Sequence, residues 1–112
     1  MTSGALAGVT VVDLTSYIAG SYAAMMLADL GADVIKVEAP SGDIMRLAAP
    51  SKHTGMGAIF LQANRNKRSL CVDLKSDAGR EAVLRLIDRA DVVIENFRPG
   101  TLEKWGVGWE VL

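Results

Sequence analysis

Gly8-Val-Thr-Val-Val-Asp-Leu14 begins the pattern from which the architecture of this chain follows. The run is rich in β-branched residues and too short for a helix, so it predicts a buried strand over residues 10–14. Residues 21–30 are good helix formers, and Gly31 follows as the expected stop. Asp33-Val-Ile-Lys-Val-Glu38 then predicts a second strand. Strand, helix and strand in this order are typical of a parallel sheet with helices packed on it.

The same alternation continues along the rest of the chain. We expect a long loop over 39–57, a short apolar stretch of undecided type over 58–63 and a basic turn over 64–68. Strands are expected over 69–73 and 91–95. The helix between them starts at its cap Ser76, with an apolar side of Ala82, Leu84, Leu86, Ile87 and Ala90. After a turn at 96–100, Thr101 is expected to cap a short helix that ends near Gly106. The order predicts an α/β fold with one parallel sheet and no linker.

Composition excludes several classes of protein. The chain has 112 residues, half of them apolar, with 12 basic and 13 acidic side chains. These values do not fit a disordered, collagen-like or disulfide-scaffold chain. Cys71 is the only cysteine, which excludes a disulfide within the chain and a cysteine-based zinc site. We expect it to be a small buried hydrophobe rather than a thiol paired with His53, the only histidine.

Charge and hydropathy bear on compartment and partners. The first basic residue is Lys36, which fits neither a secretory signal nor an import peptide, and no apolar run is long enough to cross a membrane. We therefore expect a cytoplasmic protein without a membrane partner. Residues 36–68 hold six basic and two acidic side chains. This basic middle favours a phosphorylated small ligand, and it is too weak to indicate a nucleic-acid partner.

Ligands of open parallel sheets bind at the carboxyl ends of the strands. That rule selects four segments, at 15–21, 38–43, 73–75 and 95–100. Glu38 has the place of a ribose-binding acid, but the first turn offers only Gly20 instead of a glycine-rich motif, which disfavours a dinucleotide-dependent oxidoreductase. A P-loop is absent. The strand-end carboxylates Asp13, Glu38, Asp73 and Glu95 are expected to be solvated or capping groups rather than metal ligands. Arg98, beside the expected helix at 101, favours a phosphate or carboxylate site.

Taken together, these segments resemble the amino-terminal part of the family III CoA-transferases, which include formyl-CoA transferase, carnitine CoA-transferase and the 2-methylacyl-CoA racemases. The similarity covers the chain from about Leu6 to Leu112. Its matching text is Leu6–Thr15, Ala19-Gly20, Leu27–Glu38, Gly42-Asp43, Asn66–Leu70, Asp73–Lys75 and Asp91–Gly100. Each piece alone is weak, and the ordered set at the family's spacing is specific.

The resemblance implies a Rossmann-like parallel sheet with flanking helices, as a truncated part of the large CoA-transferase domain. Residues 1–112 would then be the amino-terminal part of that CoA-binding domain, with no second domain. It also implies coenzyme A as the bound group, acyl-CoA and carboxylic acids as substrates, and an interlocked homodimer in the full-length protein. The positions that match the family's CoA contacts are Ile18, Ala19, Ala39, Val72, Asp73, Leu74, Lys75, Asn96, Phe97, Arg98 and Lys104.

Three departures from the family pattern shape the functional hypothesis. Ala39 stands where family members often carry an arginine, and Ser21 follows Ala-Gly where proline is common. Asn66 and Asn96 favour a transferase over a racemase. The family's nucleophilic aspartate lies beyond anything matching Leu112, so no residue of this chain is assigned as catalytic.

The sequence therefore predicts the amino-terminal fragment of a transferase that moves CoA between carboxylic acids through a covalent aspartyl intermediate. The isolated chain is expected to be inactive, and also prone to self-association because a cut sheet leaves an open edge. The alternatives are a non-catalytic CoA- or nucleotide-binding module and a fragment of a 2-methylacyl-CoA racemase.

Overall fold

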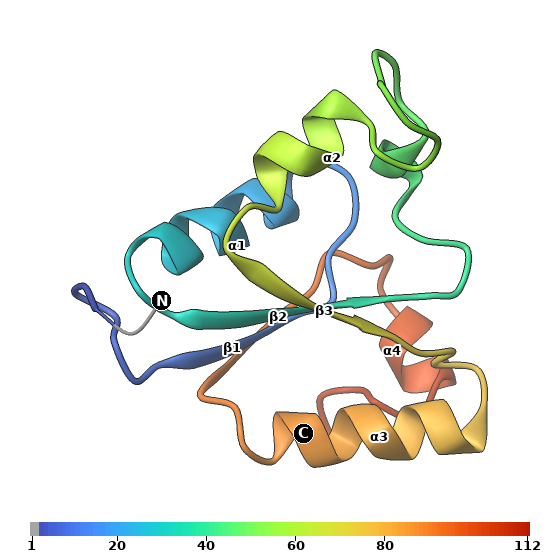
Figure 1. The fold of residues 1–112 in the computed structure, drawn as a ribbon. Coiled ribbons are helices and arrows are strands. Elements are labelled where there is room, and N and C mark those ends of the chain that lie inside the picture. The colour runs from blue at the N-terminus through green and yellow to red at the C-terminus, as the bar shows by residue number, and fades with distance from the viewer. Residues whose placement is uncertain (1–2) are drawn as a thin grey trace.

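The computed structural model describes residues 3–112 as a four-stranded parallel sheet with helices on both faces (Figure 1). The strands are β1 (Thr10–Asp13), β2 (Asp33–Glu38), β3 (Lys67–Cys71) and β4 (Val92–Ile94). The helices are α1 (Ala19–Asp29), α2 (Ala58–Ala63), α3 (Asp77–Ile87) and α4 (Thr101–Lys104), with a 3-10 turn over Ile44–Arg46.

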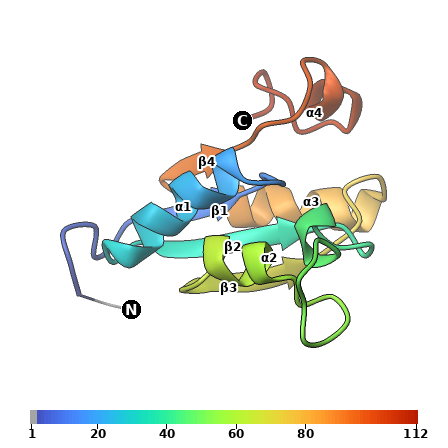
Figure 2. The same ribbon diagram turned by 90° about the horizontal axis from the view of Figure 1, so that it is seen from above.

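The sheet has the strand order β3-β2-β1-β4, and every neighbouring pair is parallel. Thr10 pairs with Asp33 across β1 and β2, and Val34 pairs with Lys67 across β2 and β3. All four strands therefore end at the same edge of the sheet. Helices α1 and α2 cover one face, and α3 and α4 lie on the other (Figures 1 and 2). The predicted fold class is confirmed.

Alternation along the strands divides the core in two, because successive side chains point to opposite faces. Val11 and Val34 pack with three alanines on and after α1, namely Ala24, Ala28 and Ala32. Val12 and Val37 pack on the opposite face with Val83 of α3 and with Leu102 and Val107 around α4. The small residues of α1 bring that helix close to the sheet, whereas larger side chains fill the α3–α4 side.

Most element boundaries agree with the sequence to within two residues; α1, for example, begins at Ala19 rather than at residue 21. Two further segments differ. Residues 58–63, for which the sequence favours no type, form α2. The expected basic turn over 64–68 is shorter, because Lys67 and Arg68 already belong to β3, which pairs with β2 from Lys67 to Cys71. The strand expected over 69–73 thus begins two residues earlier. Helix α3 does begin after its predicted cap, since the Ser76 hydroxyl accepts a hydrogen bond from the Gly79 amide at 3.0 Å.

Two residue-level predictions that bear on the elements are wrong. Cys71 is exposed rather than buried, because it ends β3, a strand at the edge of the sheet. Thr101 does not cap α4; Gly100 takes the N-cap position with φ 89°, a left-handed conformation that glycine adopts at little cost. In residues 3–112, no helix has the length and apolar character needed to cross a membrane.

Candidate functional site

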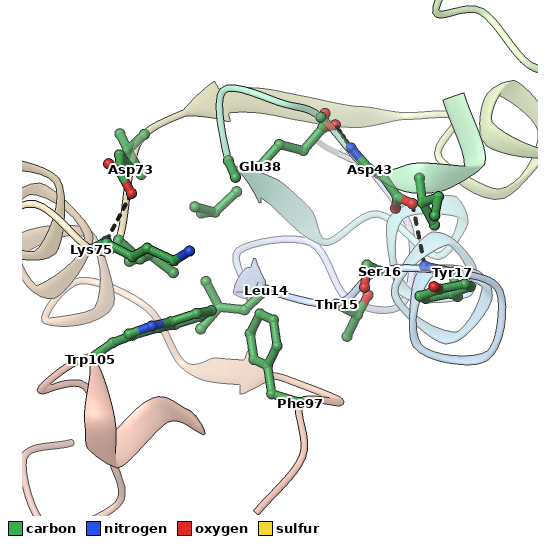
Figure 3. A pocket seen from close by; sticks show the side chains of 16 residues that line it. Leu14, Thr15, Ser16, Tyr17, Glu38, Asp43, Asp73, Lys75, Phe97 and Trp105 are labelled. Atoms are coloured by element: carbon green, nitrogen blue, oxygen red, sulfur yellow. Dashed lines mark hydrogen bonds between the residues drawn. The ribbon is translucent and has the colours of Figure 1, made fainter. Parts of the chain in front are cut away.

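A cavity of about 270 Å³ opens at the carboxyl ends of the strands (Figure 3). All four segments selected from the sequence contribute to its lining. They supply residues 15–17 after β1, Glu38 to Asp43 after β2, residues 73–75 after β3 and Phe97 after β4. The rule that ligands bind at the strand ends of a parallel sheet thus identifies the hollow that the fold contains.

One wall of the cavity is apolar and aromatic. The rings of Phe97 and Trp105 meet edge to face, with centroids 5.2 Å apart and planes at 77°. Leu14, Val37 and Leu74 complete this wall next to the two rings. Figure 3 shows the aromatic side chains reaching into the cavity from the side opposite Glu38 and Asp43. A flat apolar group would gain contact area here, because aromatic faces stack well on flat rings.

The rim beside this wall is basic. Lys75 and Lys104 line a second hollow together with Arg80, Leu74 and Trp105. Three of these residues, Leu74, Lys75 and Trp105, also border the first cavity, so the two hollows are adjacent and share these residues. Arg80 forms an exposed ion pair with Asp77 at 2.9 Å. Cations next to an aromatic wall match a ligand that joins a ring to phosphate groups.

Opposite the aromatic wall, where Glu38 and Asp43 line the cavity, buried charged side chains hold the turn after β1 and the loop after β2 in place. The Lys36 ammonium donates to the Thr15 carbonyl at 3.0 Å and to the Ser21 hydroxyl at 3.3 Å. Asp43 Oδ2 lies 3.0 Å from the same ammonium. This oxygen accepts no hydrogen bond and contacts the ammonium as an ion pair, while the other oxygen of the carboxylate accepts from the Met45 amide at 3.0 Å. Lys36 thereby ties the turn after β1 to the loop after β2.

A second buried lysine supports the same turn from β3. The Lys67 ammonium donates to Asp13 at 2.7 Å, to the Ser21 carbonyl at 2.9 Å and to Asn64 at 2.7 Å. Its side chain is 2% exposed and that of Asp13 is fully buried. Burial lowers the pKa of Lys67 below its ordinary value, and the Asp13 carboxylate counteracts part of that effect. Of the two roles expected for Asp13, solvation is wrong, because its carboxylate is enclosed with this lysine, whereas its other oxygen accepts from the Thr15 amide at 2.9 Å as a capping group does.

Glu38 is occupied in the same way. Its carboxylate accepts from the Arg46 guanidinium at 2.8 and 2.7 Å and from the Asp43 amide at 2.7 Å. Burial by itself raises the pKa of Glu38, but these hydrogen bonds hold that pKa below its ordinary value. The carboxylate is buried rather than solvated, and its oxygens face the protein. A ribose-binding role for Glu38 is already disfavoured by the sequence, and these three bonds to the protein leave its carboxylate little capacity to accept from a ribose.

The turn between β1 and α1 has an unusual backbone. Tyr17 has φ 65°, in the left-handed region that non-glycine residues rarely adopt. On one side its amide approaches Asp43 Oδ1 at 3.4 Å. On the other side the Asn96 side chain accepts from the Ser16 amide at 3.1 Å and donates to the Ser16 carbonyl at 2.9 Å. The turn is thus fixed by side chains from the loops after β2 and β4 instead of by glycines.

The sequence-selected residues fall into two groups. Ala39, Phe97 and the stretch Val72 to Lys75 line the cavity, and Lys104 lines the basic hollow beside it. Ile18, Ala19, Asn96 and Arg98 are exposed; Ala19 begins α1, directly after Ile18, and the other three belong to the bordering turns. These four residues flank the opening without contributing to its lining, although their neighbours Ser16, Tyr17 and Phe97 do line it.

Sequence reasoning missed several residues that shape the site. Trp105 directly follows Lys104 and lies one helical turn after the expected cap Thr101. That position could have marked it as a residue of the site. Tyr17 and Asp43 lie within the selected segments, but nothing in the sequence marks the left-handed turn or the burial of Asp43. Among residues 3–112, no three His, Cys, Asp or Glu side chains gather as a metal site would require.

Comparison with known proteins gives a consistent result. Residues 6–112 match the family described as CoA-transferase family III. A succinyl-CoA:mesaconate CoA-transferase of Haloarcula hispanica is 51% identical over 97% of the chain. A succinyl-CoA–D-citramalate CoA-transferase of Chloroflexus aurantiacus is 46% identical over 93%. The chain spans only 28% and 26% of the length of these two relatives.

Solved structures agree with this similarity. A CAIB/BAIF family protein from Brucella suis superposes with a TM-score of 0.91 at 46% identity. The match covers 96% of this chain and 30% of that one. The structure of Rv3272 from M. tuberculosis superposes with a TM-score of 0.87 at 45% identity, covering all of this chain and 29% of the other.

Proposed function

Because the chain belongs to CoA-transferase family III, we propose that it supplies the nucleotide-binding part of a CoA site in an enzyme that moves CoA between carboxylic acids. The observation that carries this proposal is an aromatic wall that lies next to a basic rim, since Leu74, Lys75 and Trp105 border both hollows. Phe97 and Trp105 form the wall, and Lys75, Arg80 and Lys104 form the rim. CoA joins an adenine ring to several phosphates, and this pairing of surfaces fits that end of the molecule.

Each surface has a chemical role in binding. The adenine ring would rest against Trp105 and Leu74, because stacking on an aromatic side chain contributes about 1–3 kcal/mol per base. The phosphates would meet Lys75 and Lys104. In residues 3–112 neither lysine forms an ion pair, so neither needs to give up a partner to bind an anion. The buried network beneath the turns would keep the walls at a fixed separation.

The chemical step belongs to the longer protein. The family resemblance implies an aspartate nucleophile that forms a covalent intermediate with the acyl group, and no residue of this chain has that role. Covalent catalysis needs the nucleophile placed against the thioester carbonyl. We therefore expect the 112-residue chain to bind CoA without transferring it. The names of the two transferases compared above support CoA thioesters and carboxylic acids as the substrate class.

Assembly and compartment are further parts of the proposal. Two relatives are named as the alpha and beta subunits of a succinyl-CoA–L-malate CoA-transferase, which supports an oligomeric full-length enzyme. We propose a homodimer in the cytoplasm. A non-catalytic CoA-binding module is the second candidate, because the aromatic wall and the basic rim need no catalytic group to bind CoA. The two candidates make the same prediction for binding and differ only for the longer protein.

The binding proposal is tested by calorimetric titration of the chain with CoA. We expect Trp105→Ala to raise the dissociation constant by about tenfold or more, from the loss of stacking. Lys75→Ala should raise it by about tenfold, from the loss of a charge-assisted contact. Trp105→Phe keeps an aromatic face and serves as the matched control, and Arg85→Ala, in an exposed pair with Glu81, controls for charge. Equal affinities for the wild-type chain and both test variants would reject this site.

A further inference from the structure

The β1 and β4 turns are joined by a single side chain. Strands β1 and β4 are neighbours, and the Leu14 amide still donates to the Ile94 carbonyl at 2.9 Å. Two residues further on, the chains separate. There the Asn96 amide group accepts from the Ser16 N–H at 3.1 Å and donates to the Ser16 carbonyl at 2.9 Å. A side-chain amide carries the same donor and acceptor as a peptide, so Asn96 extends the ladder beyond the end of the strands.

The residue held in this way precedes the strained position of the turn. Tyr17 has φ 65°, which costs a non-glycine residue energy that the surroundings must supply. Its own amide contact to Asp43, at 3.4 Å, is long for a hydrogen bond. The two hydrogen bonds of the Asn96 side chain are shorter, and they involve both the backbone N–H and the backbone carbonyl of Ser16. The Asn96 bonds, which come from the loop after β4, therefore restrain the turn more strongly than the Asp43 contact does.

The same side chain connects the two walls of the cavity. Ser16 and Tyr17 line one side, and Phe97, which directly follows Asn96, lines the other against Trp105. If the Ser16 peptide turns away, the wall formed by residues 15–17 moves relative to the aromatic wall. Asn96 is itself exposed and is not part of the lining. Its amide group faces Ser16.

We propose that Asn96 is a positioning residue, which holds the Ser16–Tyr17 turn in the conformation that receives CoA, rather than a direct CoA ligand. The inference rests on the proposed function. It differs from the family resemblance, in which Asn96 matches a turn that contacts the CoA chain. Here one N–H and one lone pair of the side-chain amide are bound to Ser16, which fixes the amide against the turn and leaves only its second N–H and second lone pair for any contact with CoA.

The test compares the wild-type chain with Asn96→Ala and Asn96→Asp by NMR amide exchange without ligand and by titration with CoA. Asn96→Ala should accelerate exchange at the Ser16 amide by about tenfold, because that amide loses its acceptor. Asn96→Asp keeps the acceptor, so exchange at Ser16 should stay slow. Both variants should bind CoA more weakly, by about tenfold, since both lose the bond to the Ser16 carbonyl. Arg85→Ala should change neither measurement.

The outcomes separate the two roles. Weaker CoA binding by Asn96→Ala, with Ser16 exchange and Tyr17 chemical shifts unchanged in the free protein, would show a direct contact and overturn the proposal. Faster exchange with unaltered CoA affinity would overturn it as well. An unchanged urea midpoint excludes general unfolding as the cause. If the wild-type chain does not bind CoA, the proposed function fails, while exchange at Ser16 still decides whether Asn96 holds the turn.

Discussion

The two faces of the sheet carry different chemistry at the carboxyl ends of the strands. On the α1–α2 face, Asp13, Lys36, Glu38 and Lys67 are enclosed and bound to one another or to the loops. On the α3–α4 face, Val12, Val37, Leu74 and Phe97 are apolar, and the exposed lysines lie at the rim. Alternation along β1 and β2 produces both surfaces from adjacent residues.

This difference separates a supporting surface from a binding surface. Charges on the α1–α2 face already have partners inside the protein, so they give the turns a fixed position and offer little to a ligand. The α3–α4 face keeps an open apolar wall beside lysines that have no carboxylate partner in residues 3–112. Three changes to the protein or its solution test the comparison, and their expected effects decrease from the first to the third.

Asp13→Asn removes the countercharge of Lys67 while keeping the shape of the side chain. A buried ammonium left without its partner should cost about 3–5 kcal/mol of unfolding free energy. Urea denaturation measures this loss. The double variant Asp13→Asn/Lys67→Met leaves no charge at the site and should recover most of the stability. A single variant as stable as the wild type would show that the α1–α2 face does not depend on paired charges.

Gly79→Ala perturbs the other face at the point where α3 meets the end of β3. A Cβ at this position would lie 2.0 Å from the Asp73 carbonyl oxygen, so the turn carrying Lys75 must shift. Overpacking of this kind costs about 1–3 kcal/mol. We also expect weaker CoA binding, measured by calorimetry. Ala78→Gly, one residue earlier and exposed, should lose only the helix propensity of alanine, about 1 kcal/mol, and keep its CoA affinity. If Gly79→Ala bound CoA as tightly as the wild type, the turn that carries Lys75 would not be part of the binding surface.

The pH dependence of stability gives the smallest effect. The pKa of Glu38 is below its ordinary value of 4.5 in the folded chain, so its contribution is complete above pH 4.5. It is lost as the pH falls through the lowered folded pKa. We expect Arg46→Met to reduce this acid sensitivity and to cost about 1 kcal/mol or less at neutral pH. Denaturation curves across the acid range up to neutral pH measure both. Parallel curves for wild type and variant would contradict an ionic role for Glu38.

The sequence predicts the sheet and the location of the cavity because both follow from short local patterns. β-branched runs, glycine stops and the rule for strand ends suffice for β1, β2 and the four lining segments. The buried network could not be predicted in this way. In the sequence Lys67 belongs to a basic turn, and only the pairing of β3 with β2 places its ammonium beneath α1, next to Asp13.

The same limit explains the errors at single residues. Cys71 lies in an apolar stretch, but its exposure depends on β3 being an edge strand, which is a property of the whole sheet. Asn96 is recognisable as a turn residue, while its bonds to Ser16 join positions 80 residues apart in the chain. Long-range pairing of this kind leaves no periodic signal in the sequence.

An NMR titration of the isotopically labelled chain with CoA tests most directly whether the α3–α4 side of the cavity is the binding surface. We predict the largest shift changes at Lys75, Phe97, Lys104 and the Trp105 indole, with small changes at Asp13 and Lys67. The first four residues lie on the α3–α4 side of the cavity, and the last two lie on the opposite face. Shifts concentrated around α1 and α2, or no shifts at millimolar CoA, would contradict this prediction.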